Sequence, residues 1–179
     1  MAPQTSIKLT YEDFAAIPDD GRRHEIIDGE HYVNPAPNLR HQTVSIRLAS
    51  ALFSFVREHA LGHVFAAPCD VLLTPYDIVE PDVIYVSNAN ARLLTESNIQ
   101  GVPDLLVEIL SSNRRHDKRV KFDRYERAGV PEYWIVDPDD DVVEVYRQSA
   151  GRFVRADIGD TLSSPLLPGF VLSVRELFE

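Results

Sequence analysis

Two acidic residues of this chain stand in apolar runs, where an unpaired charge would be costly. Glu108 lies within the run PDLLVEIL at residues 103–110, and Asp82 lies within the run VEPDVIYV at residues 79–86. Burying an ionised carboxylate costs free energy unless the group is paired or binds a cation. If the two runs are strands that pair in a sheet, the two carboxylates can meet. A divalent cation would then offset their repulsion, and hard oxygen ligands suit Mg²⁺.

Each acid alone also has a simpler interpretation. Asp82 could begin a strand behind Pro81, and Glu108 could be a buried acid held by a salt bridge, because structural ion pairs are common. Considered together, and with the basic segment described next, the two acids favour a functional site.

A basic segment follows Glu108 along the chain. Residues 114–127 hold seven Lys or Arg and three Asp or Glu, so the segment carries +4 and the rest of the chain −14 of the total charge of −10. If the segment is helical, Asp117, Lys121 and Tyr125 share one face, because they are four residues apart. Such a helix could be a solvated face with an Asp–Lys pair, or it could face a phosphate group. The spacing leaves both interpretations open.

Other kinds of chemistry have weaker signals. His24, His31 and His41 lack the compact spacing of a transition-metal site, such as two histidines four residues apart on a helix. We interpret them as surface or capping residues. Ser111 does not lie in the G-x-S-x-G sequence of a serine hydrolase.

The composition is that of an acidic globular protein. The chain has 179 residues, 44% hydrophobic and 26% charged, which fits one folded domain over residues 1–179. The charge of −10 argues against a protein that coats nucleic acid non-specifically. No apolar run reaches the roughly 18 residues of a membrane span, and the N-terminal residues do not resemble a signal peptide. The single cysteine cannot form an internal disulfide, so we expect a cytoplasmic protein.

Helices and strands alternate along the chain. Apolar residues at a helical period predict a long amphipathic helix over residues 41–60. Asp28-Gly29 predicts a tight hairpin between strands at 23–28 and 30–34, and the run at 103–110 predicts a central strand buried on both faces. Further strands are expected at 64–67, 69–74, 79–86, 132–136, 142–147 and 153–156, and helices at 11–17, 117–128 and 174–178. The expected fold class is α/β or α+β with a mixed central sheet.

A longer pattern of residues extends over most of the chain. Its members are Pro81-Asp82, Pro103-Asp104, Glu108, Ser111, Asp117, Lys121, Tyr125 and GVPEYWIVDP at residues 129–138, with HEIIDGE at 24–30, His41-Gln42 and LPGF at 167–170. This pattern resembles the PD-(D/E)xK nuclease superfamily and, within it, the Uma-type family of restriction endonucleases. The resemblance extends from about Tyr11 to Phe178.

The resemblance implies a restriction-endonuclease-like α/β fold, with a mixed central β-sheet flanked by helices, that cleaves phosphodiester bonds in DNA. Asp82 and Glu108 match the acidic positions of the motif and would hold Mg²⁺ or Mn²⁺, which would activate water and stabilise the transition state. Glu25 would be an auxiliary acid. The resemblance also implies a homodimer.

One position departs from the superfamily motif. Its lysine is expected at position 110, where this chain has Leu110. In the Uma-type family the lysine function moves to the following helix, which makes Lys121 the substitute and Lys118 the second choice. We therefore expect a metal-dependent endonuclease. The alternative is a catalytically inactive binding or assembly module that keeps the nuclease fold, an interpretation favoured by Leu110 and by the overall acidity.

Overall fold

A mixed sheet of six strands forms the centre of the structure, a computed structural model that describes residues 7–111 and 117–179, with side chains from residue 119 in the second stretch. In spatial order its strands are β11 (Arg152–Ala156), β10 (Val142–Ser149), β9 (Glu132–Asp137), β8 (Leu105–Ile109), β6 (Val83–Ser87) and β3 (Gly62–Ala66). β8 runs parallel to β9 and antiparallel to β6. The mixed central sheet predicted from the sequence is confirmed.

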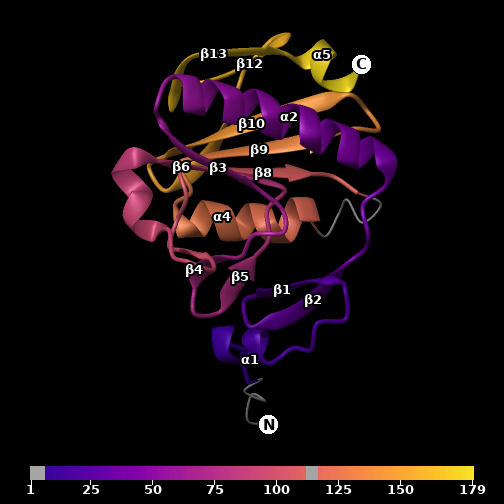
Figure 1. Ribbon diagram of the computed structural model, residues 1–179, viewed down its shortest axis with the longest axis vertical. Helices are drawn as coiled ribbons and strands as arrows, with labels where there is room; N and C mark the ends of the chain where they lie inside the picture. The colour runs from indigo at the N-terminus through magenta and orange to yellow at the C-terminus, as the bar shows by residue number, and fades with distance from the viewer. Residues whose placement is uncertain (1–6, 112–116) are drawn as a thin grey trace.

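Helices cover both faces of this sheet (Figure 1). α2 (Leu39–Glu58) lies across one face, and α4 (Phe122–Ala128), which follows the π-helical turn η2 (Asp117–Lys121), lies against the other. The other helices among the described residues are α1 (Tyr11–Ala15), η1 (Asn88–Leu93) and α5 (Val174–Phe178). No helix in the described part of the chain is long and apolar enough to cross a membrane.

A second sheet lies beyond α4, on the side away from the central sheet (Figure 1). Its strands, in spatial order, are β2 (Glu30–Asn34), β1 (Arg23–Ile27), β5 (Asp77–Val79), β4 (Val71–Thr74) and β7 (Ile99–Gln100), while β12 (Thr161–Ser164) and β13 (Leu167–Ser173) form a separate pair. The predicted hairpin turn joins β1 to β2, with φ of 56° at Asp28 and 79° at Gly29. Both values lie in the left-handed region that such a turn requires.

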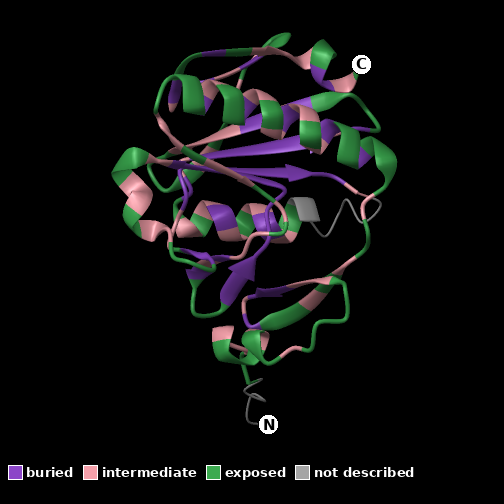
Figure 2. Cartoon of the chain, viewed as in Figure 1, coloured by how far each residue is buried: buried purple, intermediate pink, exposed green. Residues whose placement is uncertain are grey.

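The central strand β8 is buried on both faces, as its apolar sequence predicts (Figure 2). Leu105, Val107 and Ile109 pack into the apolar cluster beneath α2, and Leu106 packs into the cluster around α4. Because side chains alternate along a strand, Glu108 lies on the α4 face with Leu106. The strand therefore carries one charged side chain into an apolar layer.

The single strand predicted over residues 79–86 is wrong. The chain leaves β5 at Val79 and begins β6 at Val83, and the two strands belong to different sheets. Pro81 has no N–H group to donate to a ladder, so it favours a break at this point. Asp82 is left at the junction between the two sheets, where its backbone N–H donates to the Val107 carbonyl over 3.0 Å.

Other differences from the predicted elements are smaller. The helix predicted over 117–128 begins with the π-helical turn η2 and ends at Gly129, whose φ of 78° is left-handed. The sequence does not predict η1, β7, β12 or β13. β7 has only two residues, and Pro168-Gly169 interrupts the pattern of β13, so neither has a periodic signal.

Candidate active site

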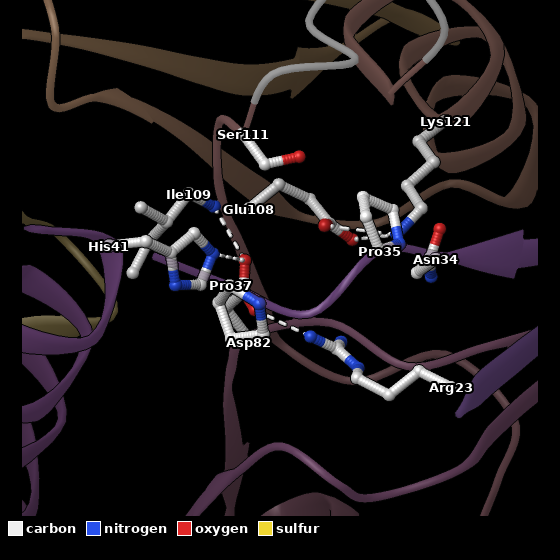
Figure 3. Close-up of a pocket in the computed structure, with 10 residues that line it drawn as sticks. All are labelled: Arg23, Asn34, Pro35, Pro37, His41, Asp82, Glu108, Ile109, Ser111 and Lys121. Carbon is white, nitrogen blue, oxygen red and sulfur yellow. Dashed lines mark hydrogen bonds and ion pairs between the residues drawn. The ribbon is translucent and has the colours of Figure 1, made fainter. Parts of the chain in front are cut away.

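Strand pairing brings Asp82 and Glu108 together. Val83 of β6 lies opposite Val107 of β8 in an antiparallel register, so the residue before Val83 lies beside the residue after Val107. Both acids are 4% exposed, and both line one cavity of about 30 Å³ (Figure 3). The cavity is also lined by Arg23, Asn34, Pro35, Pro37, His41, Ile109, Ser111 and Lys121.

Lys121 reaches Glu108 from the helical segment on the far side of the cavity. Its Nζ atom lies 3.0 Å from each carboxylate oxygen of Glu108. The Tyr125 hydroxyl donates to Oε1 of the same carboxylate over 2.6 Å. Residues four apart share a helix face, so one face of this segment supplies both donors. Leu110, at the motif's lysine position, instead packs into the apolar cluster that contains Tyr125.

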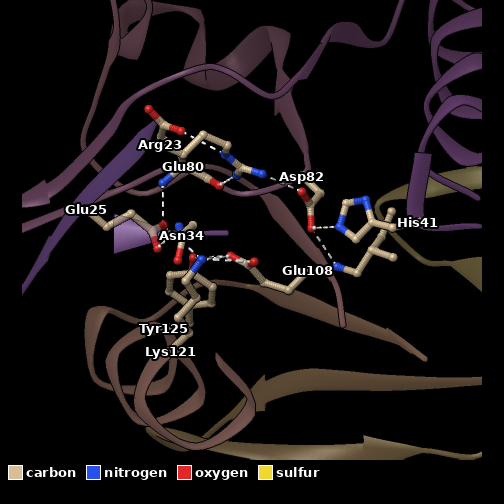
Figure 4. A network of polar contacts seen from close by, with 10 residues as sticks. Arg23, Glu25, Asn34, His41, Glu80, Asp82, Glu108, Lys121 and Tyr125 are labelled. Carbon is tan, nitrogen blue, oxygen red and sulfur yellow. Dashed lines mark hydrogen bonds and ion pairs between the residues drawn. The ribbon is translucent and has the colours of Figure 1, made fainter. Parts of the chain in front are cut away.

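Glu25 holds the other side of the Lys121 ammonium group (Figure 4). Its Oε1 atom lies 2.8 Å from Lys121 Nζ and accepts the backbone N–H of Glu80 over 2.7 Å. Its Oε2 atom accepts Asn34 Nδ2 over 2.7 Å. Glu25 comes from β1 of the second sheet, so the ammonium group bridges the two sheets.

Asp82 is fixed by donors from three directions. Oδ2 accepts the backbone N–H of Ile109 over 2.8 Å and lies 3.3 Å from Nε2 of His41. Oδ1 accepts Nη1 of Arg23 over 3.2 Å. Burial raises the pKa of Asp82, but the contact with His41 and the charge of Arg23 outweigh burial and hold that pKa below its ordinary value. Asp82 therefore favours the ionised form.

Glu108 has the opposite balance. Burial raises the pKa of Glu108 to about 8, although the charge of Lys121 acts to lower it. The negative charges of Asp82 and Glu25 add to the effect of burial. A further cation beside Glu108 would lower this pKa and favour the ionised form.

The residues of this network fit a hard divalent cation. Among the described side chains, four carboxylates, those of Glu25, Glu80, Asp82 and Glu108, share this network with the cations of Arg23 and Lys121 (Figure 4). Carboxylate oxygens are the hard ligands that Mg²⁺ and Mn²⁺ prefer, so these acids could hold such an ion.

The described residues do not offer a closed metal cage. Within residues 7–111 and 119–179, no three His, Cys, Asp or Glu side chains are arranged as a ready-made metal site. Mg²⁺ commonly takes one or two carboxylates and completes its shell with water and substrate phosphate, whereas structural zinc needs four protein ligands. Asp82 and Glu108 therefore suit Mg²⁺ or Mn²⁺ better than zinc.

The structure brings together all four residues singled out in the sequence: Glu25, Asp82, Glu108 and Lys121. It adds four residues that the sequence analysis did not assign to the site: Arg23, Asn34, His41 and Glu80. Arg23 had a detectable signal, because it alternates with Glu25 on β1 and must share its face.

The expectation for His41 needs correction. His41 is not a surface residue: it is 6% exposed, because its place in the first turn of α2 directs its ring onto Asp82. For the basic segment the sequence left two interpretations open, and in the structure Arg124 pairs with Asp28 over 2.6 Å. Arg114 and Arg115, and the side chains of Asp117 and Lys118, lie outside the described residues.

Comparison with known proteins agrees with this architecture. A structure described as a putative nuclease belonging to DUF820, from Anabaena variabilis, is 22% identical in sequence. It aligns with a TM-score of 0.78 over 95% of this chain and 97% of its own, which shows a shared fold. No curated protein matches the chain. The model of the Uma2 family, described as putative restriction endonuclease, matches residues 11–175, and the chain therefore belongs to the Uma2 family.

Proposed function

We propose that this protein is a metal-dependent endonuclease that hydrolyses phosphodiester bonds in DNA. The observation that carries the proposal is the convergence of Asp82, Glu108 and Lys121, from three separate elements, on one polar cavity. Buried clusters of acids with a strongly shifted pKa are typical of catalytic sites. Membership of the Uma2 family supports a nuclease.

Asp82 and Glu108 would hold Mg²⁺ or Mn²⁺ in this cavity. Such an ion supplies Lewis acidity toward the phosphate and a water of lowered pKa. The Ile109 N–H and His41 hold Asp82 in place, and Tyr125 holds Glu108. Fixed ligands lower the entropic cost of reaching the reactive geometry.

Lys121 would act on the phosphate group or on the attacking water. As an ammonium group held by Glu25 and Glu108, it donates hydrogen bonds and stabilises negative charge that develops on the phosphoryl oxygens. The water oxygen forms a bond to phosphorus as the bond from phosphorus to the leaving sugar oxygen breaks. The proton released by the water ends on that sugar oxygen.

The proposal is tested with nicking of supercoiled plasmid DNA in Mg²⁺ and in Mn²⁺. We expect the wild type to nick and Glu108→Gln to lose at least 100-fold in rate. Glu132→Gln is a matched control, because Glu132 is a buried acid on the adjacent strand β9, bonded to Trp134 and outside the cavity. We expect this control to nick like the wild type once its melting temperature shows that it is folded.

If the protein is instead a catalytically inactive binding module, we expect neither DNA cleavage nor metal binding. A wild type that is inert toward supercoiled, linear duplex and single-stranded DNA with both metals, and that shows no heat of metal binding in calorimetry, would overturn the nuclease proposal. Lys121 alone does not separate the two functions, because a buried Glu108 needs a cationic partner in either case.

A further inference from the structure

Arg23 lines the cavity and bridges two carboxylates, those of Glu80 and Asp82. Its side chain is 23% exposed, against 5% for Asp82 and 4% for Lys121. It extends from β1 toward the β5–β6 junction, on the same strand face as Glu25. Among the charged groups that line the cavity, Arg23 is therefore more accessible to an incoming ligand than Asp82, Glu108 or Lys121.

Glu80 anchors the guanidinium group of Arg23 on the side away from Glu108. Nε donates to Glu80 Oε2 over 2.9 Å, and Nη2 donates to the backbone carbonyl of Glu80. The third contact is the one from Nη1 to Oδ1 of Asp82, at 3.2 Å. If that contact breaks, the two bonds to Glu80 still hold the side chain in place.

A cation bound by Asp82 competes with this third contact. Oδ2 of Asp82 already receives the Ile109 N–H and lies beside His41, whereas Arg23 is the donor that the described structure places on Oδ1. A divalent cation and a guanidinium group on one carboxylate oxygen repel each other. Lys121 is less easily displaced, because Glu25 and Glu108 hold it between them.

We propose that Arg23 exchanges partners: it neutralises Asp82 in the metal-free protein and, once the metal is bound, uses Nη1 to bind a phosphate oxygen of the nucleic acid. The inference rests on the proposed nuclease function. A guanidinium group binds phosphate well because it is planar, always charged and weakly hydrated. Since Glu80 already fixes its orientation, little side-chain entropy remains to be lost on binding.

Two measurements on Arg23→Gln test the exchange, and they change in opposite directions. In calorimetry without DNA, we expect Mn²⁺ and Mg²⁺ to bind about tenfold more tightly than to the wild type, because a competing cation is gone. DNA binding is measured in Ca²⁺, which prevents turnover. We expect Arg23→Gln to bind DNA more weakly than the wild type. We also expect its plot of the logarithm of the DNA-binding constant against the logarithm of salt concentration to have a slope shallower by about one. A role limited to folding would not change these two quantities in this way.

Two further variants serve as controls. Arg147→Gln removes an arginine that also pairs with a buried glutamate, Glu132, but lies outside the cavity, and we expect it to leave the metal affinity and the salt slope unchanged. Arg23→Lys keeps the charge and loses the planar fork, so we expect the wild-type salt slope with weaker DNA binding. Thermal melting confirms that each variant is folded.

The outcomes separate this inference from the function on which it rests. Weaker metal binding in Arg23→Gln would show that Arg23 prepares Asp82 for the metal, and an unchanged salt slope would show that Arg23 does not contact phosphate. Either result overturns the exchange while leaving the nuclease function intact. A wild type that binds no metal and cuts no DNA overturns the proposed function, and the exchange with it.

Discussion

Replacing Glu108 by glutamine should remove a large pH dependence from the stability of the metal-free protein. Burial raises the pKa of Glu108 from an ordinary 4.5 to about 8. Between these two values the folded state binds a proton that the unfolded state has released. The free energy of unfolding therefore falls as the pH rises through this range. Glutamine cannot ionise, so Glu108→Gln has no such loss.

The size of the effect follows from the two pKa values. Each unit of difference corresponds to about 1.4 kcal/mol, so the wild type should lose about 3–5 kcal/mol relative to Glu108→Gln between pH 4.5 and pH 8. The pKa of Glu80 and that of Asp70 are also raised by burial, but both groups remain in the variant and their effect cancels in the difference. The depressed pKa of Asp82 acts only below its ordinary value of 3.8, outside this window.

Urea unfolding in EDTA, at intervals from pH 5 to pH 9, measures the difference. We expect the two proteins to diverge progressively, with Glu108→Gln the more stable at high pH. Added Mg²⁺ should restore wild-type stability most strongly at high pH, because it binds the ionised carboxylate. A difference that is flat with pH, or that grows toward low pH, would refute the argument that burial dominates the environment of Glu108.

Three further changes test other parts of the site and surface. Lys121→Met should lower plasmid nicking at least 100-fold while Mn²⁺ binding persists in calorimetry; loss of both together would show that Lys121 only maintains the fold. Tyr125→Phe removes the 2.6 Å bond to Glu108 and should lower the free energy of unfolding in urea by about 1–3 kcal/mol, and an unchanged value would contradict the importance of that bond. The predicted homodimer would explain why Leu39, Ile46 and Phe53, seven residues apart on α2, are exposed. In sedimentation the wild type should then be a dimer and Ile46→Glu a monomer, whereas a monomeric wild type would contradict the prediction.

The parts of the site that lie on regular elements could be predicted from the sequence. The apolar run around Glu108 marks a strand buried on both faces, and one acid within such a run needs a partner. The four-residue spacing of Lys121 and Tyr125 places both on one helix face. These signals are local, since each depends on residues within a turn or a strand of one another.

The contacts of Arg23 and His41 could not be predicted in the same way. Arg23 meets Glu80 and Asp82 across 57 and 59 positions of the chain, and His41 meets Asp82 because α2 begins beside the β5–β6 junction. No local pattern encodes either approach. The break at Pro81 was encoded locally, because proline cannot donate to a ladder, but the apolar residues around it favoured one continuous strand.

The position of the motif lysine also depends on a long-range contact, here between the strand and the helical segment. A lysine at position 110 would alternate with Glu108 on the same face of the strand, two residues further along. That face packs against α4, and Leu110 joins the apolar cluster there. The helical segment lies against this face of the strand. Lys121, on that segment, therefore brings its ammonium group to 3.0 Å from both carboxylate oxygens of Glu108. Transition-state stabilisation depends on where the positive charge lies and not on which element carries it. Under the proposed nuclease function, Lys121 would therefore take the place of the motif lysine, and Leu110 alone would not imply an inactive protein.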